Sequence, residues 1–432
     1  MASHSRRKKY TGRCHPWQLV SKMVDIRSGK MAGRNADQTG ASGPLKVLHV
    51  IPSVSRSEGG PSYAVKAFAA ALNSAGGETL VVTTGHDEDP AFNKSNLVSC
   101  ISFRRNLQLY KISFSLRRWL MEHVREFDLV HVHALFSFSS WAASHAARKH
   151  GIPYIIRPLG VLNRWGLANR RPILKWFWLR CIEIPLLKRA AAIHYTTEAE
   201  SEEARAIHPE IARVRSFVIP IPVDLQMSDV KGQSSEFLQK YPQAAGKKIV
   251  LFLARLDEKK GLDLLLEAFA SAKQEHPDSL LVIAGDGRAR FVNGLHQQAE
   301  RYGIAEHVLW TGFLGESEKA AAFSAATIYV LPSYSENFGI AAAEALASGV
   351  PTLLSDQVAI ARDAANAKAA FVVPARVPEL TRAIGQLLSD PKVREELGRN
   401  GKIAAQRLFS PARASDLLVS EYRRILGSNR TA

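Results

Sequence analysis

The sequence predicts an α/β protein with two open parallel sheets that face each other across a cleft. Its 432 residues are about twice the length of an average domain. Short strand-like runs alternate with helical segments, which is typical of parallel sheets covered by helices on both faces. The alternation occurs twice, and residues 220–245, which are rich in Pro, Gly, Ser and Lys, separate the two series as a linker.

The composition excludes several other classes of protein. Hydrophobic residues make up 46% of the chain and charged residues 22%, which excludes a disordered, collagen-like or coiled-coil protein. No apolar run is long enough to span a bilayer, so an integral membrane protein is not expected. The three cysteines are too scattered for a disulfide framework or a zinc site, which fits a reducing cytoplasm.

Positive charge is concentrated in the first half of the chain. Residues 1–44 carry 9 Lys and Arg against 2 Asp and Glu and lack hydrophobic periodicity, so we expect a disordered basic extension. Residues 45–225 carry 23 against 15, whereas residues 226–432 carry 25 against 23. A basic first half indicates an anionic partner, such as phospholipid headgroups, pyrophosphate carriers or nucleic acid. Basic surfaces also simply keep proteins soluble, and this alternative stays open.

The first series of elements begins with a β-rich run that ends in a Pro-Ser turn and is expected to be a buried strand. The expected elements are strand Lys46–Pro52, helix Tyr63–Ser74, strand Leu80–Thr84, helix Ser115–Glu126, strand Asp128–His133, helix Ser139–His150, strand Tyr154–Arg157, the amphipathic segment Arg170–Arg189 and strand Ala192–Thr196.

The second series has the same pattern. Its expected elements are strand Lys248–Ala254, helix Leu262–Glu275, strand Ser279–Ala284, helix Arg290–Tyr302, strand Val308–Thr311, helix Lys319–Ala325, strand Ile328–Leu331, helix Gly339–Ser348 and strand Pro351–Ser355. In open sheets of this kind ligands bind at the carboxyl ends of the strands, so the cleft is the expected site of chemistry.

The run Ser335–Pro351 is the most informative motif. It places Glu336 at the mouth of the cleft, just before a helix, and Glu344 on the second turn of that helix. Free amides at a helix N-terminus bind anions, and Gly339 allows a phosphate to approach the backbone. Alternatively, Glu336 caps the helix and Glu344 is a solvated surface residue. The donor-binding residues predicted around the start of this helix are Asn337, Phe338, Gly339 and Ile340.

Glu336, Glu344 and the run Ala347–Pro351 resemble the signature of the retaining, family 4 glycosyltransferases, also called group 1 glycosyltransferases. The resemblance covers residues 45–427 and implies a GT-B fold with two Rossmann-like domains facing a central cleft. It implies an N-terminal acceptor domain at 45–225, a nucleotide-sugar donor domain at 226–410, and a C-terminal helix at 411–432 that crosses back to the first domain. It further implies that Glu336 contacts the donor sugar and Glu344 the ribose.

A second motif, Ala254–Gly261, follows the first strand of the second series. Arg255 and Lys260 are expected to point toward the carboxyl end of this strand, where two cations can clamp a pyrophosphate and stabilise the leaving nucleotide. The resemblance assigns the same role to both. In isolation, they are more simply two solvated charges in a loop.

Glycine-containing turns follow two further strands. Gly59 and Gly60 come after the first strand and are expected to lie near the donor phosphates, or to form an ordinary turn. In the related enzymes, the loop Gly285-Asp286-Gly287 lies beside the nucleotide and the Thr311–Phe313 turn beside the nucleobase. A tight turn is the alternative for the first of these loops.

Two imidazoles lie on one face of the strand that contains His131 and His133. We expect His133 to be nearest the acceptor and to take part in catalysis. A packed, purely structural histidine is the alternative for both residues, more so for His131. The sequence offers no further ligand at suitable spacing for a metal. No Asp-x-Asp motif is present either, so no metal and no other cofactor is predicted.

The loop Arg157–Gly166 departs from the family pattern. Many members have a histidine in a Pro-His-Gly sequence that contacts the reacting sugar, and Leu159 occupies the matching position here. Its role is lost, unnecessary, or supplied by another group such as Arg157 or His133.

The segment Arg170–Arg189 mixes aromatic and basic residues. This pattern suits an anionic membrane surface where lipid-linked acceptors reside, and equally a core-packed helix with a basic outer face. No nucleic-acid-binding motif accompanies it, so nucleic acid is not expected as a partner.

The resemblance implies transfer of a sugar from a nucleotide-sugar donor to the hydroxyl of a glycan or lipid-linked acceptor, with retention at the anomeric carbon. The expected role is assembly of bacterial surface polysaccharide, exopolysaccharide or lipopolysaccharide, in the cytoplasm or peripherally on the inner face of its membrane. Three alternatives stay open: a GT-B nucleotide-sugar epimerase, a catalytically silent nucleotide-sugar binding subunit, and a nucleic-acid-binding protein that uses the basic half.

Overall fold

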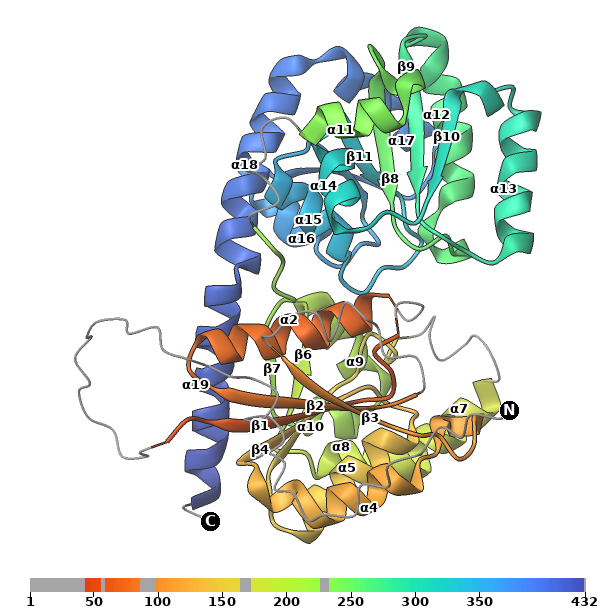
Figure 1. Cartoon of the computed structure of the whole chain (residues 1–432). Coiled ribbons are helices and arrows are strands. Elements are labelled where there is room, and N and C mark those ends of the chain that lie inside the picture. Colours follow the sequence, from red (N-terminus) through yellow and green to blue (C-terminus); the bar gives the residue numbers. More distant parts are fainter. Residues whose placement is uncertain (1–42, 56–58, 86–97, 164–171, 226–232, 431–432) are drawn as a thin grey trace, which may run out of the picture.

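The computed structural model describes residues 43–55, 59–85, 98–163, 172–225 and 233–430. The extension predicted at 1–44 lies outside these ranges except for its last two residues. The described chain forms two α/β domains, one above the other in Figure 1, and a long helical stretch runs along both of them. The two-domain architecture predicted from the sequence is confirmed.

The N-terminal domain contains a seven-stranded sheet in the order β3-β2-β1-β4-β5-β6-β7, in which all neighbouring strands are parallel. Most of these strands are buried on both faces, as expected for a sheet between two helical layers. The strands are β1 Lys46–Ile51, β2 Glu78–Thr84, β3 Ser99–Phe103, β4 Leu129–His133, β5 Tyr154–Arg157, β6 Ala192–Tyr195 and β7 Ser216–Val218.

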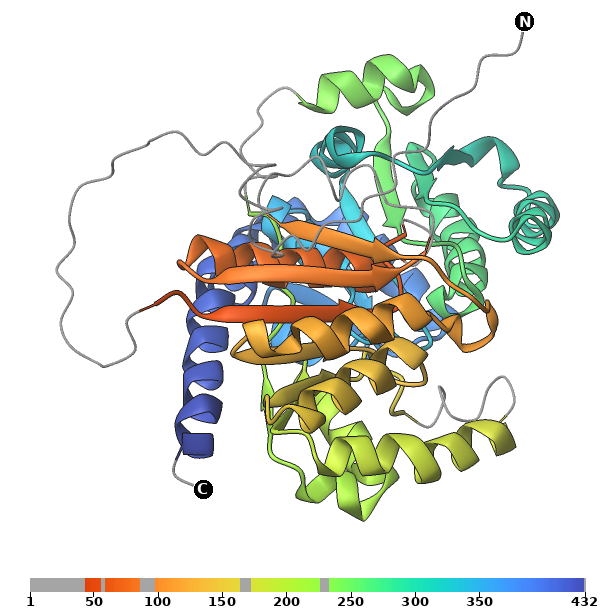
Figure 2. The ribbon, with the colours of Figure 1, turned by 60° about the horizontal axis from the view of Figure 1, so that its bottom comes forward.

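Helices cover both faces of this sheet, with α2 on one face and α4 and α5 on the other (Figure 2). Several of them begin at residues that cap a helix, because the side chains of Ser113, Ser137 and Thr197 accept a backbone N–H of the first turn. The helical elements are α2 Gly60–Ser74, η2 Leu109–Lys111, α4 Phe114–His123, η3 Val124–Glu126, α5 Phe138–Lys149, α7 Pro172–Trp178, η4 Leu179–Glu183, α8 Ile184–Lys188, α9 Glu198–Ile207 and α10 Pro209–Arg213.

The C-terminal domain repeats the arrangement with six parallel strands in the order β10-β9-β8-β11-β12-β13. Its strands are β8 Lys248–Leu253, β9 Ser279–Ala284, β10 Val308–Gly312, β11 Ile328–Leu331, β12 Thr352–Ser355 and β13 Ala370–Val373. Its helical elements are α11 Gln233–Lys240, η6 Pro242–Ala244, η7 Glu258–Lys260, α12 Leu262–Glu275, α13 Ala289–Arg301, η8 Ala305–His307, α14 Glu316–Ala325, α15 Ile340–Ser348, α16 Ala361–Asn366, α17 Val377–Ser389 and α18 Pro391–Phe409.

Two assignments made from the sequence differ from the structure. Residues 233–240 of the expected linker form α11, which packs against α14 and so belongs to the C-terminal domain. The segment 170–189 is not one helix: from Pro172 onward it consists of α7, the π-helical turn η4 and α8. A π-turn inserts an extra residue into the helix, so the amphipathic stripe read from the sequence changes face at this point.

The last helices connect the two domains. α18 ends at Phe409, and α19, Pro411–Arg430, runs down the N-terminal domain beside α2 (Figure 1). An ion pair joins Glu421 of α19 to Arg215, with 3.1 Å between Oε2 and Nη2. The fully buried Tyr422 hydrogen-bonds with His131 of β4 at 2.6 Å. α19 is therefore part of the packing of the N-terminal domain, although it follows the C-terminal domain in sequence.

The strand orders identify the point in each sheet where a ligand is expected. The order reverses between β1 and β4 in the first sheet and between β8 and β11 in the second. At such a switch point the following loops diverge to opposite faces, which leaves a crevice at the carboxyl ends of the strands.

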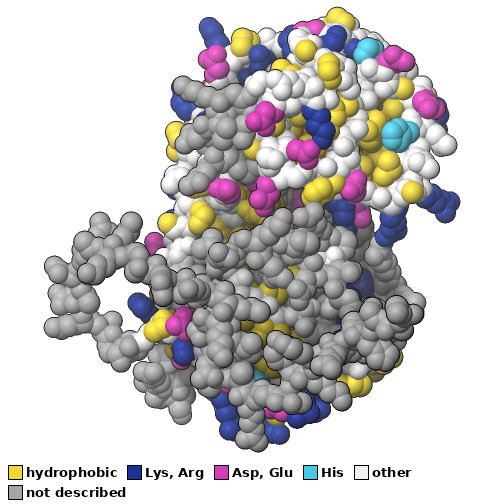
Figure 3. All heavy atoms as spheres, viewed as in Figure 1, with side chains coloured by type: hydrophobic (Ala, Val, Ile, Leu, Met, Phe, Trp, Pro, Cys, Tyr) yellow, Lys and Arg dark blue, Asp and Glu magenta, His cyan; other side chains and the backbone are white. Residues whose placement is uncertain are grey.

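The distribution of surface charge in the second domain is mixed. On the face shown in Figure 3, basic and acidic side chains are interspersed over the upper lobe, as its nearly balanced charge leads one to expect.

Candidate active site

The second switch point brings Lys260 and Glu336 together. Lys260 ends η7 after β8, and Glu336 lies between β11 and α15. Nζ of Lys260 and Oε2 of Glu336 form an ion pair, with the two side chains 17% and 16% exposed. The backbone of Glu336 is held on both sides, since its N–H donates to Gln357 O at 3.1 Å and its carbonyl accepts from Ala359 N at 2.9 Å. The carboxylate therefore has a defined position at the mouth of the crevice and does not cap α15.

Arg255 does not join this pair. Its Nη2 lies 3.8 Å from Oδ2 of Asp257, and its side chain is 60% exposed. The structure therefore brings one of the two expected cations, Lys260, to Glu336, and the predicted diphosphate clamp stays a prediction. Lys260 contacts Glu336, whereas the mostly exposed Arg255 side chain lies near Asp257 of its own loop.

The N-terminus of α15 faces the crevice without a side-chain cap. Its N-cap is Gly339, whose φ of 91° is left-handed and thus favours glycine. The first amides of the helix, beginning at Ile340, are therefore available to an anion. Phe338 behaves differently from the expectation, because it is 2% exposed and packs edge-to-face on Phe409 at 5.5 Å. Its side chain anchors the loop and does not line the crevice.

Glu344 is buried in an ion pair that sequence reasoning missed. Its Oε1 lies 2.5 Å from Nζ of Lys319 on α14, and the residue is only 2% exposed. Burial raises the pKa of Glu344, and the Lys319 ammonium partly opposes that shift. The alternative of a solvated surface glutamate is excluded. No signal in the sequence pairs two residues 25 positions apart on different helices.

The loop Gly285-Asp286-Gly287 packs closely on the loop that follows β8. A β-carbon at Gly285 would lie 2.0 Å from Ala254 O, and one at Gly287 would lie 2.5 Å from Leu256 O. The amide of Leu256 also donates to Asp286 O at 2.8 Å. Close backbone packing thus accounts for both glycines, and contact with a nucleotide stays a prediction.

Residues of the N-terminal domain meet α15 across the cleft. A β-carbon at Gly60 would lie 3.3 Å from Cδ1 of Ile340, and one at Gly160 would overlap the side chain of Asn337. Gly59 is the N-cap of α2, and it also has no side-chain cap. Two helix N-termini, those of α2 and α15, therefore approach each other at the cleft.

The histidines lie beneath the carboxyl edge of the first sheet. His133 is fully buried and joins His131, His49 and His194 in one cluster with ring centroids 4.2–5.4 Å apart. Burial is the main cause that lowers the pKa of each ring, to about 3 for His49 and His194. These rings are therefore neutral. Direct contact between His133 and an acceptor is not supported, because none of its surface is exposed.

The hydrogen bonds of His194 and His131 determine which ring nitrogens donate and which accept. The Ile219 carbonyl can only accept, so Nε2 of His194 donates to it at 2.9 Å. The neutral His194 then accepts at Nδ1 from Nε2 of His131 at 3.3 Å, and His131 accepts at Nδ1 from the Tyr422 hydroxyl. This chain connects α19 to the middle of the sheet.

The other half of the cluster starts at Arg157, which is 1% exposed. Its Nη1 donates to Nδ1 of His133 at 3.4 Å, and Nε2 of His133 donates in turn to Nδ1 of His49 at 2.9 Å. The expectation that the sequence offers no further ligand at suitable spacing for a metal was wrong, because His49 pairs in register with His131 on the adjacent strand. His49, His131 and His133 have ligand atoms within 4.8 Å of one another. The guanidinium next to His133 opposes a cation there, so the arrangement favours a neutral hydrogen-bonded cluster.

A pocket of about 430 Å³ opens at the first switch point, and we call it the N-terminal pocket. Its lining is Ile51, Pro52, Ser53, Pro61, Gln108, Tyr110, Lys111, Ala134, Leu135, Phe136, Ser137 and Leu159. Among the described residues six non-glycine positions have left-handed φ, and five of them line this pocket: Tyr110, Lys111, Ala134, Phe136 and Leu159. Backbone strain of this kind clusters at functional sites. Leu159 thus contributes an apolar wall at the position where many proteins of the resembling family have a histidine.

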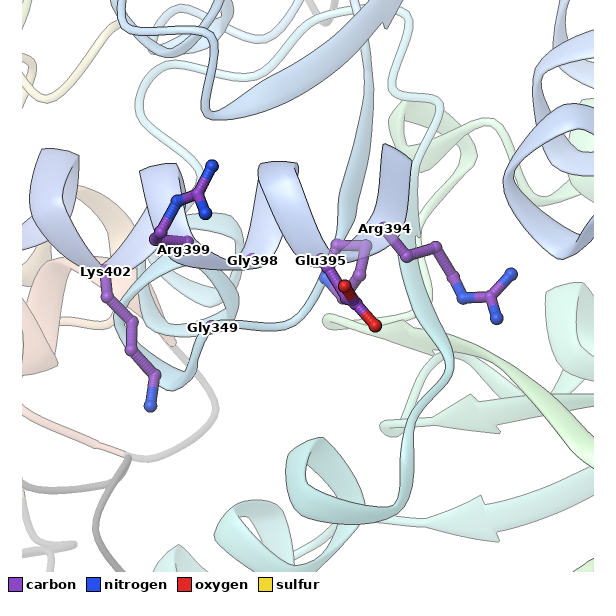
Figure 4. Close-up of a pocket in the computed structure, with 7 residues that line it drawn as sticks. Gly349, Arg394, Glu395, Gly398, Arg399 and Lys402 are labelled. Carbon is purple, nitrogen blue, oxygen red and sulfur yellow. The ribbon is translucent and has the colours of Figure 1, made fainter. Parts of the chain in front are cut away.

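A second hollow lies away from the cleft. It has a volume of about 500 Å³ and is bounded by α18 and the turn after α15 (Figure 4). Gly349, at its edge, follows the C-terminus of α15, whereas the crevice is at the N-terminus of the same helix. The two ends of this nine-residue helix are about 13 Å apart. This hollow therefore does not belong to the site around Lys260 and Glu336.

Both halves of the chain match family models. Residues 59–222 match the model described as "Glycosyl transferase 4-like domain", and residues 233–404 match "Glycosyl transferases group 1". The chain belongs to the group 1 glycosyltransferases. In this glycosyltransferase, the boundary between the two matched regions falls where the structure changes from one sheet to the other.

Relatives with curated names act on different molecules. The protein is 28% identical over 255 residues to an alpha-D-kanosaminyltransferase of Streptomyces kanamyceticus, a match that covers 59% of this chain and 64% of that protein. It is 32% identical over 237 residues to a phosphatidyl-myo-inositol mannosyltransferase of Mycobacterium tuberculosis, covering 53% and 60% of the two chains. The glycosyltransferase thus aligns with less than two thirds of either relative.

Solved structures establish the fold. The crystal structure of HepE from Anabaena in complex with UDP and glucose superposes with a TM-score of 0.74 at 18% identity, covering 88% of this chain and all of that one. The GT-B fold implied by the resemblance is confirmed.

Proposed function

We propose that this glycosyltransferase transfers a sugar from a nucleotide-sugar donor to an acceptor hydroxyl with retention at the anomeric carbon. The observation that carries the proposal is the convergence of two uncapped helix N-termini beside the Lys260–Glu336 pair. Oriented amides and a nearby ammonium suit a diphosphate, and a fixed carboxylate suits sugar hydroxyls. The HepE structure, which contains UDP and glucose, supports this choice of donor.

The chemistry follows from these positions. In the proposed transfer, Lys260 and the amides of α15 stabilise charge on the departing diphosphate, and its oxygen takes the proton of the acceptor hydroxyl. Glu336 orients the donor sugar, and we assign Glu344, which is paired with Lys319, to the ribose of the donor. None of these steps uses a metal ion. Approach of the two domains excludes water and so limits donor hydrolysis.

We place the acceptor in the N-terminal pocket and propose that it is a glycan or a lipid-linked sugar. The pocket lies at the switch point opposite the donor domain, and its lining combines apolar walls with hydroxyl groups and Lys111. The named substrate of the mycobacterial relative is a phospholipid, which supports a lipid-linked acceptor. Assembly of bacterial surface polysaccharide, exopolysaccharide or lipopolysaccharide is the corresponding biological role.

Exposed aromatic residues beside this pocket support contact with an anionic membrane at the cytoplasmic face. Trp176 and Phe177 on α7 are 47% and 62% exposed, and Trp178 stacks on Tyr110 of the pocket at 5.0 Å. Arg180 is exposed on the following turn. Aromatic and basic side chains together favour the headgroup region. Over the described part of the chain, no helix combines the length and hydropathy needed to cross a bilayer.

A donor panel tests the proposed function. UDP-, GDP-, ADP- and TDP-sugars are compared in thermal shift, because a bound donor stabilises the folded protein. The donor that raises Tm is then tested for transfer to phosphatidylinositol in phosphatidylcholine vesicles and to soluble glycosides, and NMR gives the anomeric configuration. No shift with any donor overturns the proposal. An epimerised donor formed without acceptor identifies an epimerase, and binding without turnover identifies a silent subunit.

A further inference from the structure

A buried carboxyl group lies behind the N-terminal pocket, and none of the roles described above involves it. Glu183 is 1% exposed and is the last residue of the π-helical turn η4. π-turns are rare and frequently occur at functional sites. Burying a carboxyl group costs free energy unless hydrogen bonds compensate for the lost hydration, so the buried position of Glu183 requires an explanation.

Glu183 interacts with two residues that line the pocket, Phe136 and Tyr110. Its Oε1 accepts the backbone N–H of Phe136 at 2.8 Å. Tyr110 also lines the pocket, and the charge of Glu183 adds to burial in raising the pKa of Tyr110, whose ring stacks on Trp178. Oε2 of Glu183 and the Tyr110 hydroxyl are both buried and have no hydrogen-bond partner among the described residues.

The two residues that Glu183 faces have strained backbones. The φ angle is 60° at Tyr110 and 55° at Phe136. Bulky residues keep a left-handed conformation only where their surroundings enforce it. A buried hydrogen bond to the amide of a strained residue is such a constraint, because a rotated peptide would leave both groups unpaired.

We propose that Glu183 is the positioning residue of the N-terminal pocket and holds Phe136, and with it the pocket wall, in the left-handed conformation. Only the identity of the occupant, an acceptor, rests on the proposed function. The position of Glu183 between α7 and α8 further links the pocket to the exposed aromatic residues of α7.

The carboxyl group gives this interaction a measurable pH dependence. Burial raises the pKa of Glu183 to about 7, and the Phe136 amide acts in the opposite direction. Among the described residues, Tyr110 is the titratable side chain that interacts electrostatically with Glu183, and it stays neutral because its own pKa is raised. The ionised carboxylate is the stronger acceptor, so the hold on Phe136 weakens as pH falls through about 7.

Amide hydrogen exchange on the full chain tests the proposal. In Glu183→Ala the protection factor of the Phe136 amide falls at least about tenfold, whereas in Glu183→Gln, which keeps a carbonyl acceptor, it changes less than about threefold. Glu126→Ala is the matched control, because Glu126 also has one unpartnered buried oxygen but bonds His123 away from the pocket. Protection at Phe136 in the wild type also falls as pH drops through about 7, and this step is absent in Glu183→Gln.

The outcomes separate this proposal from the proposed function. Unchanged Phe136 exchange in Glu183→Ala, or the same pH step in Glu183→Gln as in the wild type, overturns the positioning role. If Glu183→Ala does not fold, the comparison of the pH step in Glu183→Gln with that in the wild type still tests the positioning role. The readout needs no turnover, whereas failure of every donor to shift the wild-type Tm overturns only the proposed function.

Discussion

Replacing Lys319 by methionine leaves the buried Glu344 carboxylate without its partner. The two groups are 2.5 Å apart, the Lys319 side chain is 18% exposed and Glu344 is 2% exposed. Methionine preserves most of the volume of lysine, so lost packing contributes little. The dominant effect is therefore an unpaired buried charge between α14 and α15.

The expected loss of stability is about 3 kcal/mol, because removing one partner of a buried ion pair leaves an uncompensated charge. For a domain of this size, each kcal/mol lowers Tm by about 2–4 °C, so the expected decrease is about 6–12 °C. Lys319→Arg keeps the charge and serves as the control. The double variant Lys319→Met/Glu344→Gln removes both charges and is expected to recover most of the loss.

The loss depends on pH in a direction that the structure determines. Burial raises the pKa of Glu344 above its ordinary value near 4.5, so the carboxyl is more readily protonated in the folded state than in the unfolded state. Its contribution to stability is fully present below the unfolded pKa and is lost as pH rises through the folded pKa. Without Lys319 the folded pKa rises further. The deficit of Lys319→Met is therefore small near about pH 5 and large near about pH 8.

Scanning calorimetry of the four proteins at both pH values measures these differences. The explanation fails if Lys319→Met melts within about 2 °C of the wild type near pH 8, or if its deficit is the same at both pH values. A double variant no more stable than Lys319→Met would also contradict it, because the loss would then not come from the unpaired charge.

Three further changes test the site and the interdomain helix. Glu336→Gln is expected to lower turnover by orders of magnitude with Tm nearly unchanged, and a variant that keeps most of its activity would remove Glu336 from the site. Lys260→Ala is expected to weaken donor binding and slow transfer together, as measured by calorimetric titration and initial rates; unaltered kinetics would reject a role in diphosphate binding. Tyr422→Phe leaves Nδ1 of His131 without its donor and is expected to cost about 1–3 kcal/mol in urea denaturation, whereas a loss below about 0.5 kcal/mol would show that the hydrogen bond does not hold α19.

Much of the fold could be predicted because its signals are local. The helix Leu262–Glu275 and the strands Ser279–Ala284 and Ile328–Leu331 have the bounds expected from periodicity alone. β3 was not predicted, because none of its five residues is fully buried and its pattern is weak. The π-turn was not predicted either, since a single extra residue in a helix leaves no separate mark in an amphipathic stripe.

In the candidate site, too, some features could be predicted from the sequence and others could not. Spacing along the chain was sufficient to place Glu336 and Lys260 in loops at the same edge of a parallel sheet, where the structure pairs them. Arg255 lies in the same loop as Lys260, but its mostly exposed side chain lies near Asp257 and not beside Glu336. A sequence position determines which edge of the sheet a residue reaches, but not which neighbours its side chain contacts there.

The sequence by itself determined the two sheets, the loops that carry the donor-site residues and the family to which the chain belongs, because these depend on short-range periodicity and motif spacing. Only the tertiary structure decided the partners: Lys319 for Glu344, His49 for His133, and the Phe136 amide for Glu183. These partners are separated by 25, 84 and 47 positions and meet because of strand order and helix packing. Buried polar groups must find partners wherever the packing places them, and one sequence alone does not specify that packing.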